Sequence, residues 1–100
     1  MQDDKVPCRS PAEGRDGVTR IPRWKYETVS RAIRDAVREA GPGGLPFADL
    51  PNAVRGRLDA RSLDRLGSLN WHVTTVKLEM EVQGEIARKG RTVPQLLVAR

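Results

Sequence analysis

Few residues in this chain of 100 could carry out chemistry, and they do not form a catalytic set. His72 is the only histidine and Cys8 the only cysteine. A lone cysteine forms no disulfide framework, and His72 has no Cys, Asp or Glu at metal-ligand spacing. Ser68 lies one helical turn before His72 but lacks the glycine-rich elbow of a serine hydrolase. We therefore expect a protein that is not an enzyme and that uses no metal and no cofactor.

Basic residues are the other group with binding chemistry. Eighteen Lys and Arg residues against thirteen Asp and Glu residues give a net charge of +5, which favours a polyanionic partner. Arg88, Lys89 and Arg91 form a dense basic group near the end of the chain. No apolar run is long enough for a signal peptide or a membrane span. These features predict a cytoplasmic protein that does not bind membranes.

The elements that would position these residues lie in the last three quarters of the chain. Residues 1–23 contain three prolines, two glycines and charges of both signs, without apolar periodicity. That composition predicts a disordered N-terminal tail. Residues 24–100 are predicted to form one domain.

Three helices are predicted in this domain. The first has amphipathic spacing from Tyr26 to Ala40 and is followed by a short strand at residues 45–47. The second is short and begins near Asp49. The third begins at Ser68 as the capping residue and ends before Gly84. Residues 59–67 are predicted to be a connector with at most one helical turn.

A β-hairpin is predicted after the third helix. Its first strand covers residues 85–88, and its turn is Lys89-Gly90-Arg91. Leu96 and Val98 then alternate with other residues on the returning strand, which is the pattern of a half-buried strand.

This order of elements resembles that of the winged helix-turn-helix superfamily over residues 24–100. The residues that carry the resemblance are Val73, Val76 and Met80 before Gly84, and Ile86 after it. The runs 71–81 and 84–88 are also similar to a small bacterial family with no established activity. The resemblance implies an α+β, mainly helical domain with three helices and a C-terminal two-stranded β-hairpin wing.

The resemblance to winged helices further implies binding to double-stranded DNA, as a transcription regulator or accessory factor. In DNA-binding members the third helix enters the major groove, and contacts from the wing to phosphates position the protein. The residues predicted to contact DNA are Asn70, Thr74, Thr75, Lys77, Arg88, Lys89 and Arg91.

Two features of the third helix favour a different partner. Residues 68–84 contain one basic residue against two acidic residues, although phosphate neutralisation dominates DNA affinity. Trp71, Leu78 and Val82 also form a second apolar face opposite the face that packs in the core. Such a face either packs within the monomer or forms an interface with another protein or a second copy. A protein-interaction or dimerisation module is therefore the alternative function, and a winged domain that binds structured RNA is a third.

Overall fold

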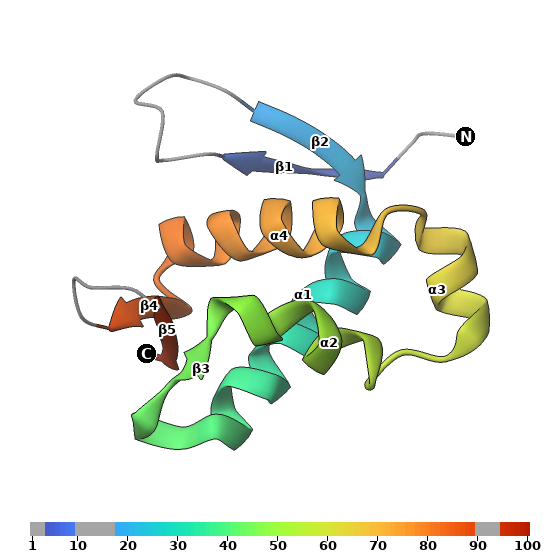
Figure 1. Ribbon diagram of the computed structural model, residues 1–100. Helices are drawn as coiled ribbons and strands as arrows, with labels where there is room; N and C mark the ends of the chain where they lie inside the picture. The colour runs from blue at the N-terminus through green and yellow to red at the C-terminus, as the bar shows by residue number, and fades with distance from the viewer. Residues whose placement is uncertain (1–3, 10–17, 90–94) are drawn as a thin grey trace.

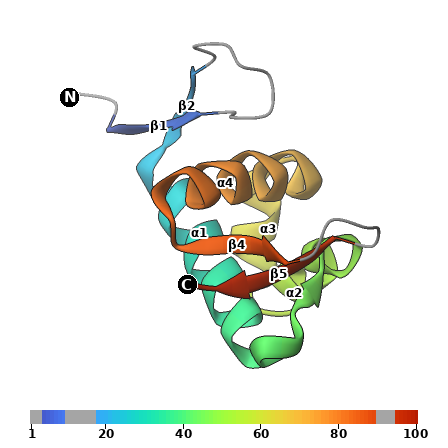
Figure 2. The same cartoon turned by 90° about the vertical axis from the view of Figure 1, so that its left-hand side faces the viewer.

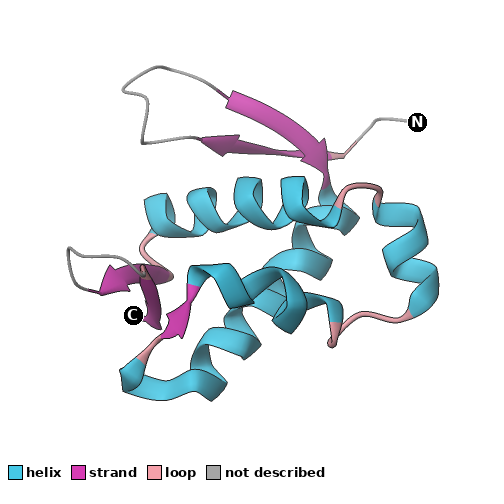
Figure 3. Cartoon of the chain, viewed as in Figure 1, coloured by secondary structure: helices cyan, strands magenta, loops and turns pink. Residues whose placement is uncertain are grey.

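The structure, a computed structural model, describes residues 4–9, 18–89 and 95–100. It is an α+β domain, mainly helical, with two small antiparallel sheets (Figures 1 and 3). Its elements are β1 Lys5–Arg9, β2 Val18–Pro22, α1 Arg23–Ala40, η2 Gly41–Gly43, β3 Leu45–Pro46, η3 Phe47–Asp49, α2 Leu50–Arg55, α3 Ala60–Leu66, α4 Leu69–Gln83, β4 Ile86–Lys89 and β5 Leu96–Ala99.

The core lies between α1, α2 and α4. Val29, Ile33 and Val37 recur at four-residue intervals along α1 and are fully buried. They face Val76 and Met80 of α4 in one apolar cluster. The helical spacing of these residues puts one apolar stripe on each helix, and burying both stripes against each other stabilises the pair.

Helix α4 begins and ends as its sequence predicts. The Ser68 hydroxyl accepts a hydrogen bond from the backbone N–H of Trp71 at 3.2 Å, which satisfies one of the free amides of the first turn. Gly84 ends the helix in a left-handed conformation, with φ of 80°. The predicted third helix is therefore confirmed as a single uninterrupted element.

The C-terminal sheet has the strand order β3–β5–β4 (Figure 2). Strands β4 and β5 are antiparallel, with Ile86 opposite Ala99, so the two strands predicted after α4 are present. Strand β5 also pairs with β3, which ties the connection after α1 to the end of the chain. Gly90 and Arg91 of the predicted turn lie outside the described residues.

The prediction of a disordered tail over residues 1–23 is wrong where the structure describes it. Strands β1 and β2 pair antiparallel, and helix α1 begins at Arg23, the last residue of the predicted tail. Val6, Cys8 and Ile21 are buried beneath this hairpin. Each strand contributes only one or two apolar side chains, so the segment resembles a tail in composition. Its burial depends on a helix almost 60 residues later in the chain.

The connector predicted at residues 59–67 is also corrected, because most of it is helix α3. Asp59 caps this helix by accepting a hydrogen bond from the Ser62 backbone N–H at 2.7 Å. Leu66 at its C-terminal end is buried in the core. The domain thus has four α-helices within the described residues, one more than predicted.

Candidate interaction surface on helix α4

The outward face of α4 lies between the two antiparallel hairpins. The β1–β2 hairpin lies on one side of the helix, and strands β4 and β5 lie on the other (Figures 1 and 2). Helix α1 and helix α2 pack against the inner face. We call the exposed stripe of α4 the outer face; it consists of Asn70, Trp71, Thr74, Thr75, Leu78 and Val82.

The outer face carries no charged side chain, and its large side chains are apolar. Trp71 is 46% exposed and Val82 is 37% exposed, whereas Leu78 and Thr75 between them are partly buried. Asn70 and Thr74 are exposed beside them. The sequence left open whether Trp71 packs within the monomer, and the structure leaves nearly half of its surface in solvent. Large apolar side chains grouped on one face are typical of interaction surfaces.

Lys77 does not belong to this face, although it was predicted as an outward residue. Its exposed fraction is only 3%. Its Nζ lies 2.6 Å from the Glu81 carboxylate and 4.6 Å from the centroid of the Phe47 ring. At 100° per residue, position 77 falls on the flank of the helix that faces η3. The aliphatic stem is therefore buried and the ammonium group is enclosed.

The two basic residues of β4 point in different directions. Arg88 Nε pairs with the Glu81 carboxylate at 2.9 Å, beside α4. Lys89 Nζ donates to the Pro42 carbonyl of η2 at 2.7 Å. Side chains alternate across a strand, so neighbours on β4 face opposite sides. Arg88 therefore flanks the outer face, Lys89 does not, and Arg91 lies outside the described residues.

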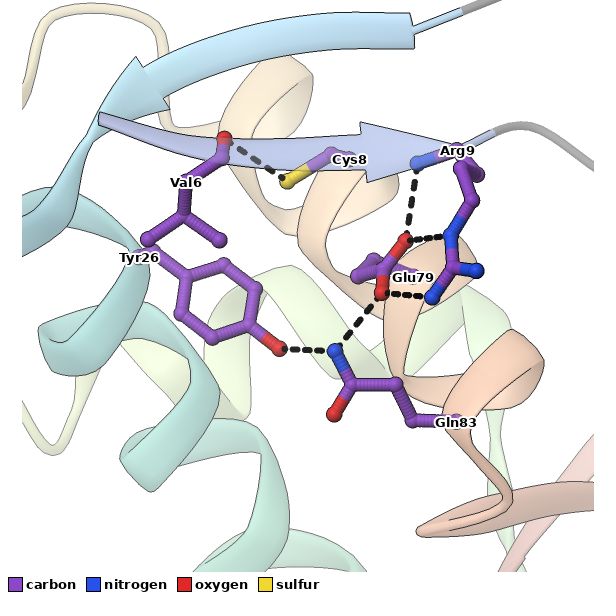
Figure 4. Close-up of polar contacts among 6 residues, drawn as sticks. All are labelled: Val6, Cys8, Arg9, Tyr26, Glu79 and Gln83. Atoms are coloured by element: carbon purple, nitrogen blue, oxygen red, sulfur yellow. Dashed lines mark hydrogen bonds and ion pairs between the residues drawn. The ribbon is translucent and has the colours of Figure 1, made fainter. Parts of the chain in front are cut away.

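Glu79 fixes the N-terminal hairpin to α4, and the sequence analysis missed this contact (Figure 4). The Glu79 carboxylate is almost fully buried and accepts hydrogen bonds from the Arg9 backbone N–H at 2.8 Å and from the Arg9 guanidinium at 2.7 and 3.0 Å. The Gln83 side chain donates to the same carboxylate at 2.6 Å and to the Tyr26 hydroxyl at 3.5 Å. A charged residue among apolar ones on α4 was the available signal for a buried ion pair.

The pKa values of Glu79, Cys8 and Tyr26 are shifted by burial and by neighbouring groups. Burial alone would raise the pKa of Glu79, but hydrogen bonds from Arg9 and Gln83, with the Arg9 charge, lower it below its ordinary value. Burial, and secondarily the Glu79 charge, raises the pKa of the Cys8 thiol to about 11. Burial and neighbouring carboxylates raise the pKa of Tyr26 to about 12. The hairpin is therefore held by a charged acceptor, and Cys8 beneath it is a protonated thiol.

His72 is part of the helix packing rather than a reactive group. Its Nδ1 lies 2.7 Å from the Ser68 carbonyl, and its ring packs edge-on against Trp71 with centroids 4.8 Å apart. Burial lowers the pKa of His72, and the nearby Lys25 charge acts in the same direction. The ring is therefore neutral at pH 7 and donates its Nδ1–H to the carbonyl.

A hollow of about 280 Å³ lies between α1 and the α2–α3 connection and is lined by Arg31, Asp35 and Arg57, so its charges are mixed. No group of three or more His, Cys, Asp or Glu side chains within the described ranges is arranged to hold a metal ion. Among the helices described, none has the length and apolar character needed to cross a membrane.

Fold and surface together define a mainly helical α+β domain with an exposed apolar stripe on its central helix. The chain belongs to a family of unknown function, DUF6958, whose model matches residues 5–97. The match begins at the first residue of β1, so it includes the N-terminal hairpin as well as the helices. Neither the curated proteins nor the solved structures gave a match to the chain.

Proposed function

We propose that this chain is a protein-interaction module built on a winged helix-turn-helix scaffold, and that the outer face of α4 is its binding site. The observation that carries the proposal is the exposure of Trp71 and Val82, 46% and 37%, on a face without charged side chains. Trp is among the residues most enriched at the energetic centres of protein interfaces. Burial of apolar surface is favourable, and the monomer leaves part of the Trp71 side chain in water. A partner that covers Trp71 would gain this stabilisation.

The winged scaffold is supported by the order of elements. Helix α1, strand β3, helix α2, helix α4 and the β4–β5 pair follow one another as in that superfamily, with α3 inserted before α4. Strand β3 pairs with β5, so the minimal first strand joins the two strands of the proposed wing. In this comparison α4 takes the place of the helix that reads DNA in the DNA-binding members.

The charges around α4 favour a protein partner over DNA. Phosphate neutralisation by Lys and Arg supplies most of the affinity of DNA-binding proteins. Lys77, the one basic residue of α4, is buried against Glu81 and Phe47. An apolar helix surface instead gains stability by removing its side chains from water against a complementary protein surface.

Photo-cross-linking tests this proposal in cells. A photoreactive phenylalanine analogue would replace Thr74, which is exposed on the outer face, and in a control variant Asp35, which is exposed on α1. We expect a discrete protein adduct from position 74 and none from position 35. If the adduct contains a different protein, additional expression of the wild-type chain should reduce it, whereas expression of Leu78→Glu should not. No adduct at position 74, or equal adducts at both positions, would refute the proposal.

DNA binding is the second candidate function, and the exposed Arg88 beside α4 is the observation that favours it. Asn70 and Thr74 are exposed on the same helix and remain predicted groove contacts. If DNA is the partner, affinity should fall steeply with salt, and Arg88→Ala should flatten the slope of log affinity against log salt by about one unit. Absence of binding to duplex DNA at about 50 mM salt would eliminate this candidate.

A further inference from the structure

We propose that the partner of the outer face is a second copy of this chain, and that the two α4 helices pack antiparallel about a two-fold axis. This inference rests on the proposed function, because it assigns an occupant to the same surface. It starts from the spacing of four residues on the outer face, of which Trp71 and Val82 are exposed and Thr75 and Leu78 are partly buried. Trp71, Thr75, Leu78 and Val82 follow one another at intervals of four, three and four residues.

That spacing is the one by which a helix packs along another helix. Apolar residues that alternate between intervals of three and four form the seam of a coiled coil, in which each side chain inserts between residues of the facing helix. The fully buried residues of α4, including Val73, Val76 and Met80, lie on the opposite side and already pack in the core. The free stripe therefore fits a helix better than a sheet or an extended peptide.

The side-chain sizes along the stripe are complementary in the antiparallel direction. When two copies of the stripe run in opposite directions, Trp71 lies opposite Val82 of the second copy, and Thr75 lies opposite Leu78. Every layer then combines a large side chain with a small one, which is the arrangement that fills space without voids. A parallel pair would instead place Trp71 against Trp71 in one layer and Thr75 against Thr75 in another.

Charges favour the same direction. Glu81 lies at the edge of the outer face, where it pairs with Lys77 and Arg88. In a parallel pair the two Glu81 carboxylates would lie side by side. In the antiparallel pair each Glu81 lies opposite the first turn of the second α4, about 14 Å along the helix from the other Glu81. A carboxylate near a helix N-terminus is favourable, because the free amides there carry partial positive charge.

The size of the stripe predicts weak pairing. A helix of 15 residues is about 22 Å long, and a strip about 10 Å wide along it covers on the order of 200 Å². Stable interfaces bury about 800 Å² per partner. The pair therefore needs additional contacts from the flanking strands. We expect a dissociation constant of about tens to hundreds of micromolar, so the measurements should extend to a protein concentration of about 1 mM.

Sedimentation equilibrium of the purified chain measures this association. We expect a monomer–dimer equilibrium that Leu78→Glu weakens at least about tenfold, because a charge at the seam is desolvated without a partner. Trp24→Glu is the matched control; Trp24 is 38% exposed on α1, and its replacement should change the dissociation constant less than about twofold. Circular dichroism of each variant separates a lost dimer from a lost fold.

Disulfide trapping measures the direction of the helices. In a Cys8→Ser background, Trp71→Cys and Val82→Cys variants should form a mixed disulfide when combined, and Val82→Cys alone should not form one with itself. Self-linked Val82→Cys would indicate parallel packing and overturn the antiparallel pair. A wild-type chain that stays monomeric to about 1 mM would overturn self-association altogether. The adduct at position 74 separates the two proposals: a mass other than that of a second copy retains the interaction module but not the dimer.

Discussion

Replacement of Glu79 by Gln tests whether the ion pair with Arg9 holds the N-terminal hairpin on α4. The carboxylate accepts hydrogen bonds from Arg9 and Gln83 at 2.6 to 3.0 Å. A hydrogen bond to a charged group contributes about 1.5–3 kcal/mol, and the half-exposed guanidinium regains water when its partner is lost. We therefore expect Glu79→Gln to lower the free energy of unfolding by about 2 kcal/mol, and Glu79→Ala by about 3 kcal/mol.

Glu85→Gln is the matched control for this measurement. Glu85 pairs with Arg34 at 2.9 Å, with about a third of each side chain exposed. Such a pair contributes about 0.5 kcal/mol, so urea denaturation should separate the two variants clearly. Amide hydrogen exchange should also accelerate at Val6 and Cys8 in Glu79→Gln only. Equal small losses of stability in both variants, with unchanged exchange in β1, would show that another contact holds the hairpin.

The pH dependence of stability gives the same contact a second test. The pKa of Glu79 is lower in the folded chain than its ordinary value of 4.5. The carboxylate therefore stabilises the fold at pH values above 4.5, and this contribution is lost as the pH falls through the folded-state pKa. Glu79→Gln cannot ionise, so its free energy of unfolding should decline less steeply than that of the wild type as the pH falls below 4.5. An unchanged acid slope would contradict the argument.

Three further predictions follow from single residues. Tyr26 is the only tyrosine, and its absorbance titration should give a pKa of about 12 in the folded chain and about 10 in urea. Because the pKa is higher in the folded chain, the free energy of unfolding should fall as the pH rises from about 10 to about 12. Cys8, buried with a pKa of about 11, should resist alkylation at pH 8 and react at the ordinary rate of a free thiol once urea unfolds the chain. Gly44→Ala should lower the free energy of unfolding by about 2 kcal/mol or more, because φ is +88° and the new Cβ would lie 2.9 Å from Leu96 Cβ. Gly67→Ala is the control: φ is also +88°, but the new Cβ would meet no atom within 4 Å. This variant should lose about 1 kcal/mol in the same urea assay.

The helical part of this fold could be predicted because its signals are local. Ser68 and Gly84 mark the ends of α4, and the apolar spacing within it identifies its buried side. Helix α3 escaped prediction because it is only seven residues long and contributes one fully buried side chain, Leu66. A segment that short has too few periods for its apolar pattern to be distinguished from a connector.

The outer face was predicted only in part, because helical periodicity gives the direction of a side chain but not what covers it. Trp71, Leu78 and Val82 were correctly grouped on one side of α4, and two of them are exposed. Lys77 was predicted as an outward residue that contacts DNA, and burial of Glu79 was not predicted. Their burial depends on Phe47 and Arg9, which lie 30 and 70 residues earlier. No pattern within the helix contains that information.

The contact between Arg9 and Glu79 also constrains the order in which the chain acquires its structure. Strands β1 and β2 leave the ribosome before α4, yet the surface that buries Val6 and Cys8 is supplied by α4. A nascent hairpin without its packing surface is at best marginally stable. During synthesis, the β1–β2 hairpin is therefore expected to dock only after α4 has emerged.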